Sequence, residues 1–506
     1  MSMFPTTTTN VLTPGSTQSQ QQEDEGGLPA QLLQLEPDLC SLAQLERIFC
    51  LASLCDGPLQ QLARIMVDGL VRRRLGTINR ALIHPYCQRS VRTARCSFIK
   101  LLPFLKMAYV AINRVILDDM ENEKFVHIID LSGPAAHWWQ WLKLMRAFRQ
   151  RPEGPPADLR ITMVHDDGEF LAAASARLRK EADSLNMAFT FHGFFLCRRL
   201  ETLLDLGADD LHAALAVKFG YARALSCALQ MCRLLEVDAA ATWPPGASSS
   251  NFVHYARERT MMKTNLHSDP SPTTPLSPLL SPPTPSPPPL TRFLRALSLK
   301  VLAVVEQEVN NHNHNAPDFT ARFRDLLHYY AALFDALEDD DAAAAAPGGA
   351  ERRHHKMQTQ EVEQVVLGEE IRDALVRGAA AEPFRQWAAA RTEEGAGGLG
   401  PVPLSWVAKM EADEVLRKRK VRGYENRGRE HGGVPENCLL LCRGGRPLYA
   451  VSAWRPRSTA ASEVASSSAF ASVVPLPRQI PSTWTWPQQQ AQQLRFTTSP
   501  VDHRMQ

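Results

Sequence analysis

The segment from Phe125 to Leu131 constrains the fold most, because it reads Phe-Val-His-Ile-Ile-Asp-Leu, a short apolar run that ends in an acid. Such a run is typical of a strand that is buried on both faces of a parallel sheet and leads into a loop. Four further runs have the same character: Leu159–His165, Ala188–Phe194, Ala214–Phe219 and Leu299–Val305. The sequence therefore predicts five parallel strands.

Segments with helical periodicity alternate with these strands. We expect helices at Ala135–Arg149, Gly168–Leu185, Tyr221–Leu235 and Phe319–Leu337. Near the C-terminal end, Gly444 and Gly445 separate two further strand-like runs and favour a tight hairpin turn, since glycine accepts positive φ. The pattern predicts an α/β fold, a Rossmann-like and methyltransferase-related sheet that is mostly parallel, with a C-terminal antiparallel hairpin.

Composition divides the chain into segments. Residues 1–27 and 458–506 are polar, poor in large apolar side chains, and predicted to be disordered tails. Between them we expect an N-terminal helical cap over 28–120 and an α/β core over 121–457. A proline-rich insertion at 266–290 and a low-complexity insertion at 339–350 interrupt the core, and neither is expected to have a fixed fold.

Charge and cysteine content limit the classes of protein. The 506 residues carry 56 Lys and Arg against 54 Asp and Glu, a net charge of +2, so any contact with nucleic acid must be local. No signal sequence or bilayer-spanning run is visible, which predicts a soluble intracellular protein with no membrane partner. The 10 cysteines form no Cys-x-x-Cys pair, which favours buried free thiols.

The loop after Asp130 decides whether a cofactor site is expected. Ligands of parallel sheets bind beyond the carboxyl ends of the strands, where Asp130, His165 and Asp166 fall. A nucleotide site also needs a glycine-rich turn, but here Gly133 is followed by Pro134, which lacks an N–H donor. We therefore expect no cofactor, no metal and no catalytic residues. Asp130 is interpreted as a loop-bracing acid, and His127 as a core histidine hydrogen-bonded within the sheet.

Two leucine patterns are candidates for partner binding. Heptad spacing makes one face from Leu32, Leu35, Leu39 and Leu42, although burial within the cap is an alternative interpretation. The motif Leu200-Glu201-Thr202-Leu203-Leu204 matches a partner-docking helix, with Leu200, Leu203 and Leu204 as its contacts, but core packing is the more common origin of such spacing.

A basic run stands at Arg417, Lys418, Arg419 and Lys420. We consider three roles for it: a nuclear import signal, contact with nucleic-acid phosphates, or a solvated helix end.

Several ordered motifs together resemble the GRAS family of plant proteins. Val126, His127, Ile128, Ile129 and Asp130 spell the VHIID motif of that family, between segments that are similar to its two leucine heptad regions. Pro383-Phe384-Arg385 is similar to its PFYRE region, and Ser452, Ala453 and Trp454 spell its SAW motif. Several segments, among them Tyr330–Asp335, resemble the Scarecrow-like protein 3 branch.

The resemblance implies a nuclear transcriptional regulator and not an enzyme. It implies partners among other GRAS proteins, including DELLA repressors, and among zinc-finger DNA-binding factors, with indirect contact to DNA and a role in gibberellin response. Two alternatives stay open: an S-adenosylmethionine-dependent methyltransferase, based on strand order and Asp130, and a direct DNA-binding factor, based on the basic run from Arg417.

Overall fold

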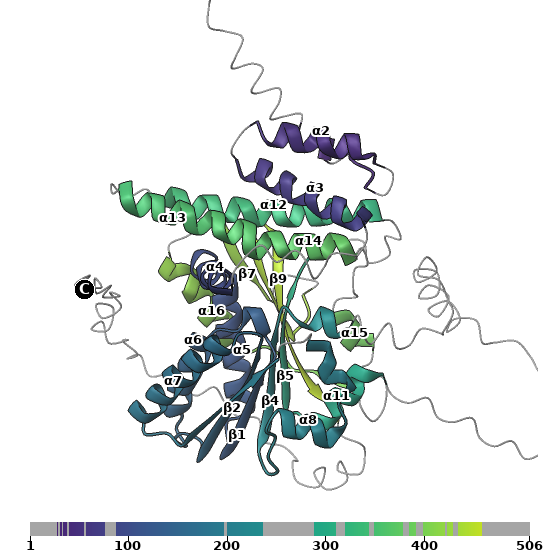
Figure 1. Cartoon of the computed structure of the whole chain (residues 1–506). Coiled ribbons are helices and arrows are strands. Elements are labelled where there is room, and N and C mark those ends of the chain that lie inside the picture. Colours follow the sequence, from purple (N-terminus) through teal and green to yellow (C-terminus); the bar gives the residue numbers. More distant parts are fainter. Residues whose placement is uncertain are drawn as a thin grey trace, which may run out of the picture. The chain divides into compact units, whose positions relative to one another are not determined.

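A nine-stranded sheet lies at the centre of the computed structural model (Figure 1). The structure describes residues 28, 31–32, 34–37, 40–54, 57–75, 88–196, 200–235, 288–309, 319–343, 349–377, 384–390, 398–419, 423–428 and 434–457. All of them fall in one unit that ends at Thr459. The predicted tails, and the proline-rich insertion up to residue 287, lie outside the described residues.

The strand order is β3-β2-β1-β4-β5-β9-β8-β7, and β6 pairs with β9. Strands β1 to β5 pair in parallel, and β7, β8 and β9 are antiparallel. Their bounds are β1 (Phe125–Asp130), β2 (Asp158–His165), β3 (Phe189–Phe195), β4 (Ala222–Ala228), β5 (Val301–Gln307), β6 (Leu399–Pro401), β7 (Tyr424–Arg427), β8 (Cys438–Arg443) and β9 (Arg446–Pro456). The predicted hairpin is confirmed as β8–β9, with Gly444 and Gly445 at φ of 56° and 78°.

Helices cover both faces of the sheet and form a separate layer beyond one end of it (Figure 1). Their bounds are α2 (Leu42–Ala52), α3 (Pro58–Leu75), α4 (Gln88–Leu101), α5 (Phe104–Asp119), α6 (Trp138–Arg149), α7 (Gly168–Ser184), α8 (Ala208–Ala214), α11 (Pro289–Leu297), α12 (Phe319–Ala343), α13 (Gly349–Glu361), α14 (Gly368–Arg377), α15 (Phe384–Ala390) and α16 (Trp406–Arg419). Short 3-10 segments are η2 (Gly133–Ala135) and η3 (Leu200–Asp205), and η5 (Val362–Leu367) is a π-helical turn.

Two hydrophobic cores lie on opposite faces of the sheet. In β1, Val126 and Ile128 join one core, whereas Ile129 joins the other, because successive side chains of a strand point to opposite faces. Helices α5, α6 and α7 cover the first core, and α8, α11 and α15 cover the second (Figure 1). This double burial explains why the strands read as nearly continuous apolar runs.

The helical cap combines N-terminal helices with helices from the later part of the core. Helix α3 packs against α12 and α14, and the Asp68 carboxylate accepts a 2.6 Å ion pair from Arg372 Nε. Gly69 permits this approach, since a Cβ there would lie 2.6 Å from the Leu375 side chain. Helix α5, which was predicted in the cap, instead packs on strands β5 and β9. The predicted cap therefore extends too far at its C-terminal end, because α5 buries its apolar side chains against the sheet.

Four local predictions are also wrong. The predicted strand at 214–219 is the end of α8 and a turn, and the predicted helix at 221–235 begins instead as strand β4. Pairing with β1 and β5 overrides the helical preference of the alanines in β4. Helix α12 continues to Ala343 through part of the predicted low-complexity break, since alanine is a strong helix former. Pro289, near the end of the predicted insertion, opens α11.

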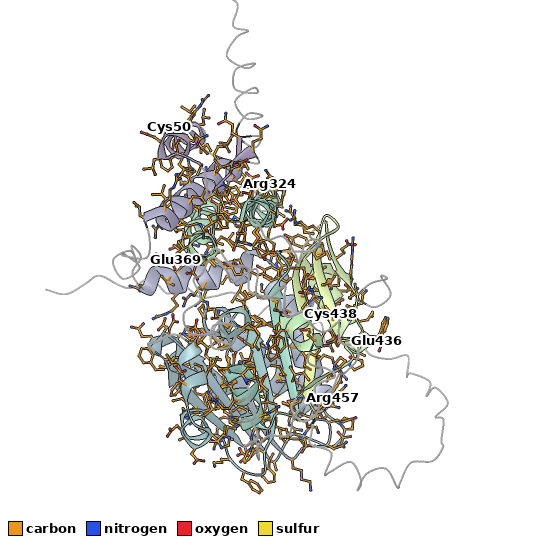
Figure 2. All side chains as sticks on the ribbon, turned by 90° about the vertical axis from the view of Figure 1, so that its right-hand side faces the viewer. Cys50, Arg324, Glu369, Glu436, Cys438 and Arg457 are labelled. Atoms are coloured by element: carbon orange, nitrogen blue, oxygen red, sulfur yellow. The ribbon has the colours of Figure 1, made fainter. Side chains whose placement is uncertain are left out.

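Side chains fill the space between the helices and the sheet (Figure 2). The seven described cysteines are free thiols, and Cys438 lies buried in the sheet, but Cys50 is exposed on the outermost helix, contrary to the expected burial. No single helix in the described ranges is long and apolar enough to cross a bilayer; α4 and α5 would reach that length only as a pair, which is bent by 78°.

Candidate functional site

The carboxyl edge of strands β1 and β2 is where a ligand would bind in this fold, and Asp130 stands at its centre. The Asp130 carboxylate is fully buried. Its Oδ1 atom accepts a hydrogen bond of 2.9 Å from the Ser132 backbone N–H, and its Oδ2 atom accepts one of 2.9 Å from Trp141 Nε1. Burial raises the pKa of Asp130, opposed by these bonds. Asp130 therefore braces the loop, as the sequence analysis expected, and an indole fills the space beside it.

The ring of His127 is also buried, within the sheet. The Thr162 hydroxyl donates to the Leu215 carbonyl at 2.8 Å, so it can only accept at 2.9 Å from His127 Nε2–H. Burial, with the nearby Arg160 and Arg223, lowers the pKa of His127 to about 3. The ring is therefore neutral at physiological pH, and its interpretation as a core histidine is confirmed.

The loop after β1 is tied down at several points and forms no phosphate cradle. The Tyr109 hydroxyl donates to the Ala135 carbonyl, and Ser132 Oγ accepts from the Ala228 N–H at 3.1 Å. Gly133 has φ of 49°, and a Cβ there would contact the Gln230 side chain. A nucleotide would need free backbone N–H groups in this loop. Here Pro134 has no N–H, the chain forms a short 3-10 turn, and packed side chains occupy the space.

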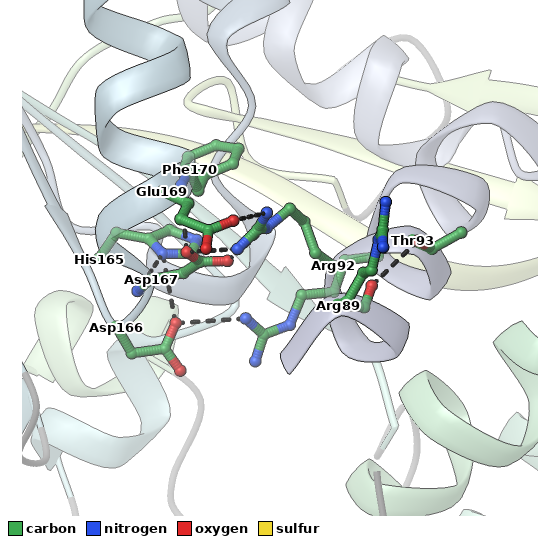
Figure 3. A network of polar contacts seen from close by, with 9 residues as sticks. Arg89, Arg92, Thr93, His165, Asp166, Asp167, Glu169 and Phe170 are labelled. Atoms are coloured by element: carbon green, nitrogen blue, oxygen red, sulfur yellow. Dashed lines mark hydrogen bonds and ion pairs between the residues drawn. The ribbon is translucent and has the colours of Figure 1, made fainter. Parts of the chain in front are cut away.

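Helix α4 closes the edge of the sheet with an ion-pair network (Figure 3). Arg92 contacts Asp167 through Nε–Oδ2 at 2.6 Å and Nη2–Oδ1 at 2.9 Å, and its Nη1 atom contacts Glu169 at 2.6 Å. Asp167 also caps α7 by accepting from the Phe170 N–H. The network therefore joins α4 to the first turn of α7.

His165 lies inside this network and is held as a neutral ring. Its Nδ1 atom accepts from the Asp167 N–H at 2.9 Å, and its ring stacks on Phe170 at 4.3 Å between centroids (Figure 3). Burial lowers the pKa of His165 to about 4, opposed by Asp166. Both nearby carboxylates are engaged, since Asp166 contacts Arg95 at 3.2 Å.

The space left at this edge is too small for a cofactor. A pocket lined by Arg92, Arg95, Pro134, His137 and His165 has a volume of about 10 Å³. That volume holds about one water molecule, whereas small-molecule sites measure hundreds of Å³. The residues at this edge therefore do not fit S-adenosylmethionine. Within the described ranges, no group of His, Cys, Asp and Glu side chains has the arrangement of a metal site either.

Comparison with known proteins identifies the family to which this chain belongs. The model of the GRAS domain family matches residues 36–455. The chain belongs to the GRAS family. It is therefore a plant transcriptional regulator and not an enzyme.

Individual GRAS relatives agree with this assignment. Scarecrow-like protein 3 of Arabidopsis thaliana is 33% identical over 450 residues, 82% of this chain and 84% of that protein. GRAS family protein TF80 of Medicago truncatula is 32% identical over 71% of this chain and 77% of its own length. DELLA protein RGA of Arabidopsis thaliana is 28% identical over 83% of this chain, which spans 59% of that protein.

The fold of this GRAS protein is also that of a solved structure. The crystal structure of SCL7 from Oryza sativa covers 85% of this chain and 99% of its own, with a TM-score of 0.59 and 24% sequence identity. This likeness confirms the predicted fold class.

The predicted leucine face of the GRAS cap is mostly buried. Leu32 and Leu35 lie in the core, Leu39 is outside the described residues, and Leu42 is 58% exposed. Of the two interpretations, burial within the cap therefore applies to Leu32 and Leu35, because those two side chains are covered by the cap itself. Leu42 instead shares an exposed side of α2 with Phe49, seven residues later.

The second leucine motif is also directed inward. Leu203 and Leu204 are buried in the core beneath α11, and Leu200 is half-buried beside it. The motif forms the 3-10 turn η3 and no α-helix, so it lacks the continuous exposed helix face that partner docking requires. Core packing, the alternative interpretation, accounts for its spacing.

The basic run divides by role. Arg417 and Lys418 are exposed and pair with Glu414. Arg419 donates to the backbone carbonyls of Lys100 and Leu101 at the end of α4, which is a structural role. Lys420 lies outside the described residues. Arg417 and Lys418 therefore end α16 as solvated cations beside Glu414, as one of the three interpretations expected.

The SAW motif is structural and lies in β9. Ser452 Oγ accepts from Trp454 Nε1 at 3.0 Å, and Ala453 pairs with Ala303 of β5. The Trp454 ring meets Phe384 edge to face at 6.1 Å. The motif therefore fastens the antiparallel strands to the parallel half of the sheet.

A buried acid pair beside this motif was missed from the sequence. Glu306 accepts from the Phe384 N–H at 2.5 Å and from the Arg385 N–H at 3.2 Å, and Glu308 accepts from Arg385 Nη2 at 2.6 Å. Burial raises the pKa of Glu306 to about 7. The sequence does contain one indication of this pair: two glutamates stand at alternate positions at the end of an apolar strand. Charged side chains are rare in such buried positions unless they are paired.

Proposed function

We propose that this GRAS protein acts in the nucleus by associating with other GRAS proteins, including DELLA repressors, and with zinc-finger DNA-binding factors, in gibberellin-responsive growth. Residues 28–457 would form the GRAS domain, with residues 1–27 and 458–506 as tails. The likeness to Scarecrow-like protein 3 and to DELLA proteins supports the branch and the hormone response.

The filled carboxyl edge of the sheet is the observation that carries this proposal. In enzymes with such a sheet, the reacting groups gather at that edge. Here Trp141 occupies the space beside Asp130, and Arg92 closes the entrance through Asp167. The chain therefore offers its outer surfaces to other molecules, which suits a protein that works by association.

Helix α2 supplies one face for such association. Leu42 and Phe49 are exposed on it, and Leu54 follows at its end. Large apolar side chains that cluster on a surface mark sites of protein contact. The proposed partner face is thus Leu42 with Phe49, in place of the heptad face expected from the sequence.

Nuclear entry is proposed to depend on Arg417 and Lys418, with Lys420 beyond them. Both described side chains are exposed at the end of α16. Contact with DNA would then be made by the zinc-finger partner.

The test is immunoprecipitation of the full chain from nuclease-treated nuclei, with the recovered proteins identified by mass spectrometry. We expect GRAS and zinc-finger proteins, and nuclease treatment removes partners that are bridged only by DNA. Recovery of neither class would contradict the proposal. Loss of the chain should also change transcript levels of gibberellin-responsive genes; unchanged levels would contradict the hormone role.

The methyltransferase alternative is tested by calorimetry of the full chain with S-adenosylmethionine. We expect no heat of binding, because the pocket has room for about one water molecule. Tight binding would show that the edge of the sheet opens.

A further inference from the structure

A dense cluster of cations lies on the face formed by α4, α5, α6, α7 and α16, which neighbour one another in the fold (Figure 1). We call it the basic surface and define it by Lys100, Lys106, Lys143, Arg146, Arg177, Lys418 and Arg419. The chain as a whole is almost neutral, with a net charge of +2. The positive charge here is therefore local.

Interactions between neighbouring residues show that the cluster is continuous. His137 lies at its centre, where Lys106, Arg177 and Lys100 all act to lower its pKa, after burial. On the next turn of α6, Arg146 and Lys418 act in the same way on Lys143. Each of these groups thus lies in the field of several like charges.

Only part of this charge is compensated within the chain. Glu181 pairs with Arg146, and Glu414 pairs with Lys418. Over the described ranges, no carboxylate comes within ion-pair distance of Lys100, Lys143 or Arg177. Crowded like charges raise the free energy of the folded chain, and an anionic partner would remove that penalty.

Aromatic rings lie among the cations. The Arg177 guanidinium stands 4.1 Å from the centroid of the Trp138 ring, and the Lys143 ammonium stands 5.5 Å from that of Trp139. The His137 ring lies 4.9 Å from Trp138. Both tryptophans are half-buried, so they offer apolar surface beside the charges.

We infer that the basic surface binds an acidic peptide segment of a partner protein, with its carboxylates on Lys100, Lys143 and Arg177 and an apolar side chain against Trp138. The mixture of charge and half-buried indole favours a peptide over a DNA backbone, which presents phosphates without apolar side chains. This inference rests on the proposed function for its biological role and names the chemistry of one partner.

The test measures binding of the purified full chain to a short labelled peptide of Asp, Glu and Phe by fluorescence anisotropy. We expect salt-sensitive binding, and no binding of the matched Asn, Gln and Phe peptide. The double variant Lys100→Glu with Arg177→Glu should weaken binding at least about tenfold, since each reversal places like charges together. Arg47→Glu, which reverses a single exposed charge on distant α2 and so matches each reversal taken alone, should bind normally.

A measurement of folding keeps the result interpretable. Because Lys100 and Arg177 pair with no described carboxylate, their reversal removes no ion pair, and loss of the Arg177 contact with Trp138 should lower the unfolding midpoint by at most about 2 °C. If the double variant unfolds early, Lys143→Glu alone provides the binding test.

Two results would overturn the inference. One is equal binding of the acidic and neutral peptides. The other is tighter binding of a labelled DNA duplex that the same reversals abolish, which would assign the surface to nucleic acid. Both results come from the purified chain and do not depend on association in the nucleus. Failure of the proposed function would be detected separately, by the immunoprecipitation experiment.

Discussion

Arg92 and Asp167 meet through two parallel hydrogen bonds, at 2.6 and 2.9 Å, that join α4 to the N-terminus of α7. The Asp167 side chain is 7% exposed, and its carboxylate also caps the helix. This single pair closes the edge of the sheet that enzymes of related fold keep open. By joining α4 to α7 it leaves too little space for a cofactor at this edge, within the described residues.

Removal of Arg92 should therefore destabilise the chain. Arg92→Ala leaves the Asp167 carboxylate half-satisfied in a nearly buried position, and we expect a loss of about 2–4 kcal/mol in the free energy of unfolding. Denaturant titration measures it. Arg179→Ala, at an exposed residue of α7, is the control and should cost under about 0.5 kcal/mol. A loss below 1 kcal/mol for Arg92→Ala would show that the pair contributes little.

Loss of the indole N–H of Trp141 is expected to destabilise the chain. Trp141→Phe keeps most of the apolar volume but removes a hydrogen bond to the buried Asp130, so the free energy of unfolding should fall by about 2–3 kcal/mol. Trp139→Phe makes the same substitution at a half-buried ring of the same helix that does not bond to Asp130, and it serves as the comparison. Equal effects of both substitutions on thermal or denaturant unfolding would argue against the bracing role of Asp130.

Glu306 should make stability depend on pH near neutrality. Its pKa rises from 4.5 to about 7 on folding, because burial outweighs the two backbone N–H bonds. Between these values the folded state holds a proton that the unfolded state has released, so stability falls as pH rises from about 4.5 to 7. The total change is about 3 kcal/mol.

Denaturant titrations at several pH values test this behaviour. Glu306→Gln should remove that part of the pH dependence, while Glu425→Gln, at a more exposed strand position, should not. A wild-type profile that is flat between pH 5 and 7 would contradict the raised pKa.

Two leucines of the predicted partner face should behave in opposite ways. Leu32→Asp places a charge in the core and should unfold the cap or the whole chain. Leu42→Asp lies on the surface, so it should leave the unfolding midpoint within about 2 °C of wild type. If α2 is the partner face, Leu42→Asp should also abolish association in light scattering or immunoprecipitation. Retained association would remove Leu42 from that face.

Periodicity was enough to predict β1, β2, β3 and β5 to within two residues at their ends. It failed at β4, where alanines that favour a helix in isolation are held as a strand by two neighbours. The role of Asp130 was predictable because a single glycine followed by proline rules out a cradle for phosphates. The role of His127 was predictable because it lies inside an apolar strand. Glu306 was missed, since its partners Phe384 and Arg385 stand 78 and 79 residues away.

The sequence by itself determined the fold class, the family and the lack of a glycine-rich cradle, because these depend on local patterns and ordered motifs. Only the tertiary structure decided which leucines are covered, which carboxylates are buried and which cations gather on one face. Those properties depend on contacts between segments far apart in the chain, such as Asp68 with Arg372, and no local pattern records them. Burial then sets the energetic cost of each charge, and with it the places where a partner can bind.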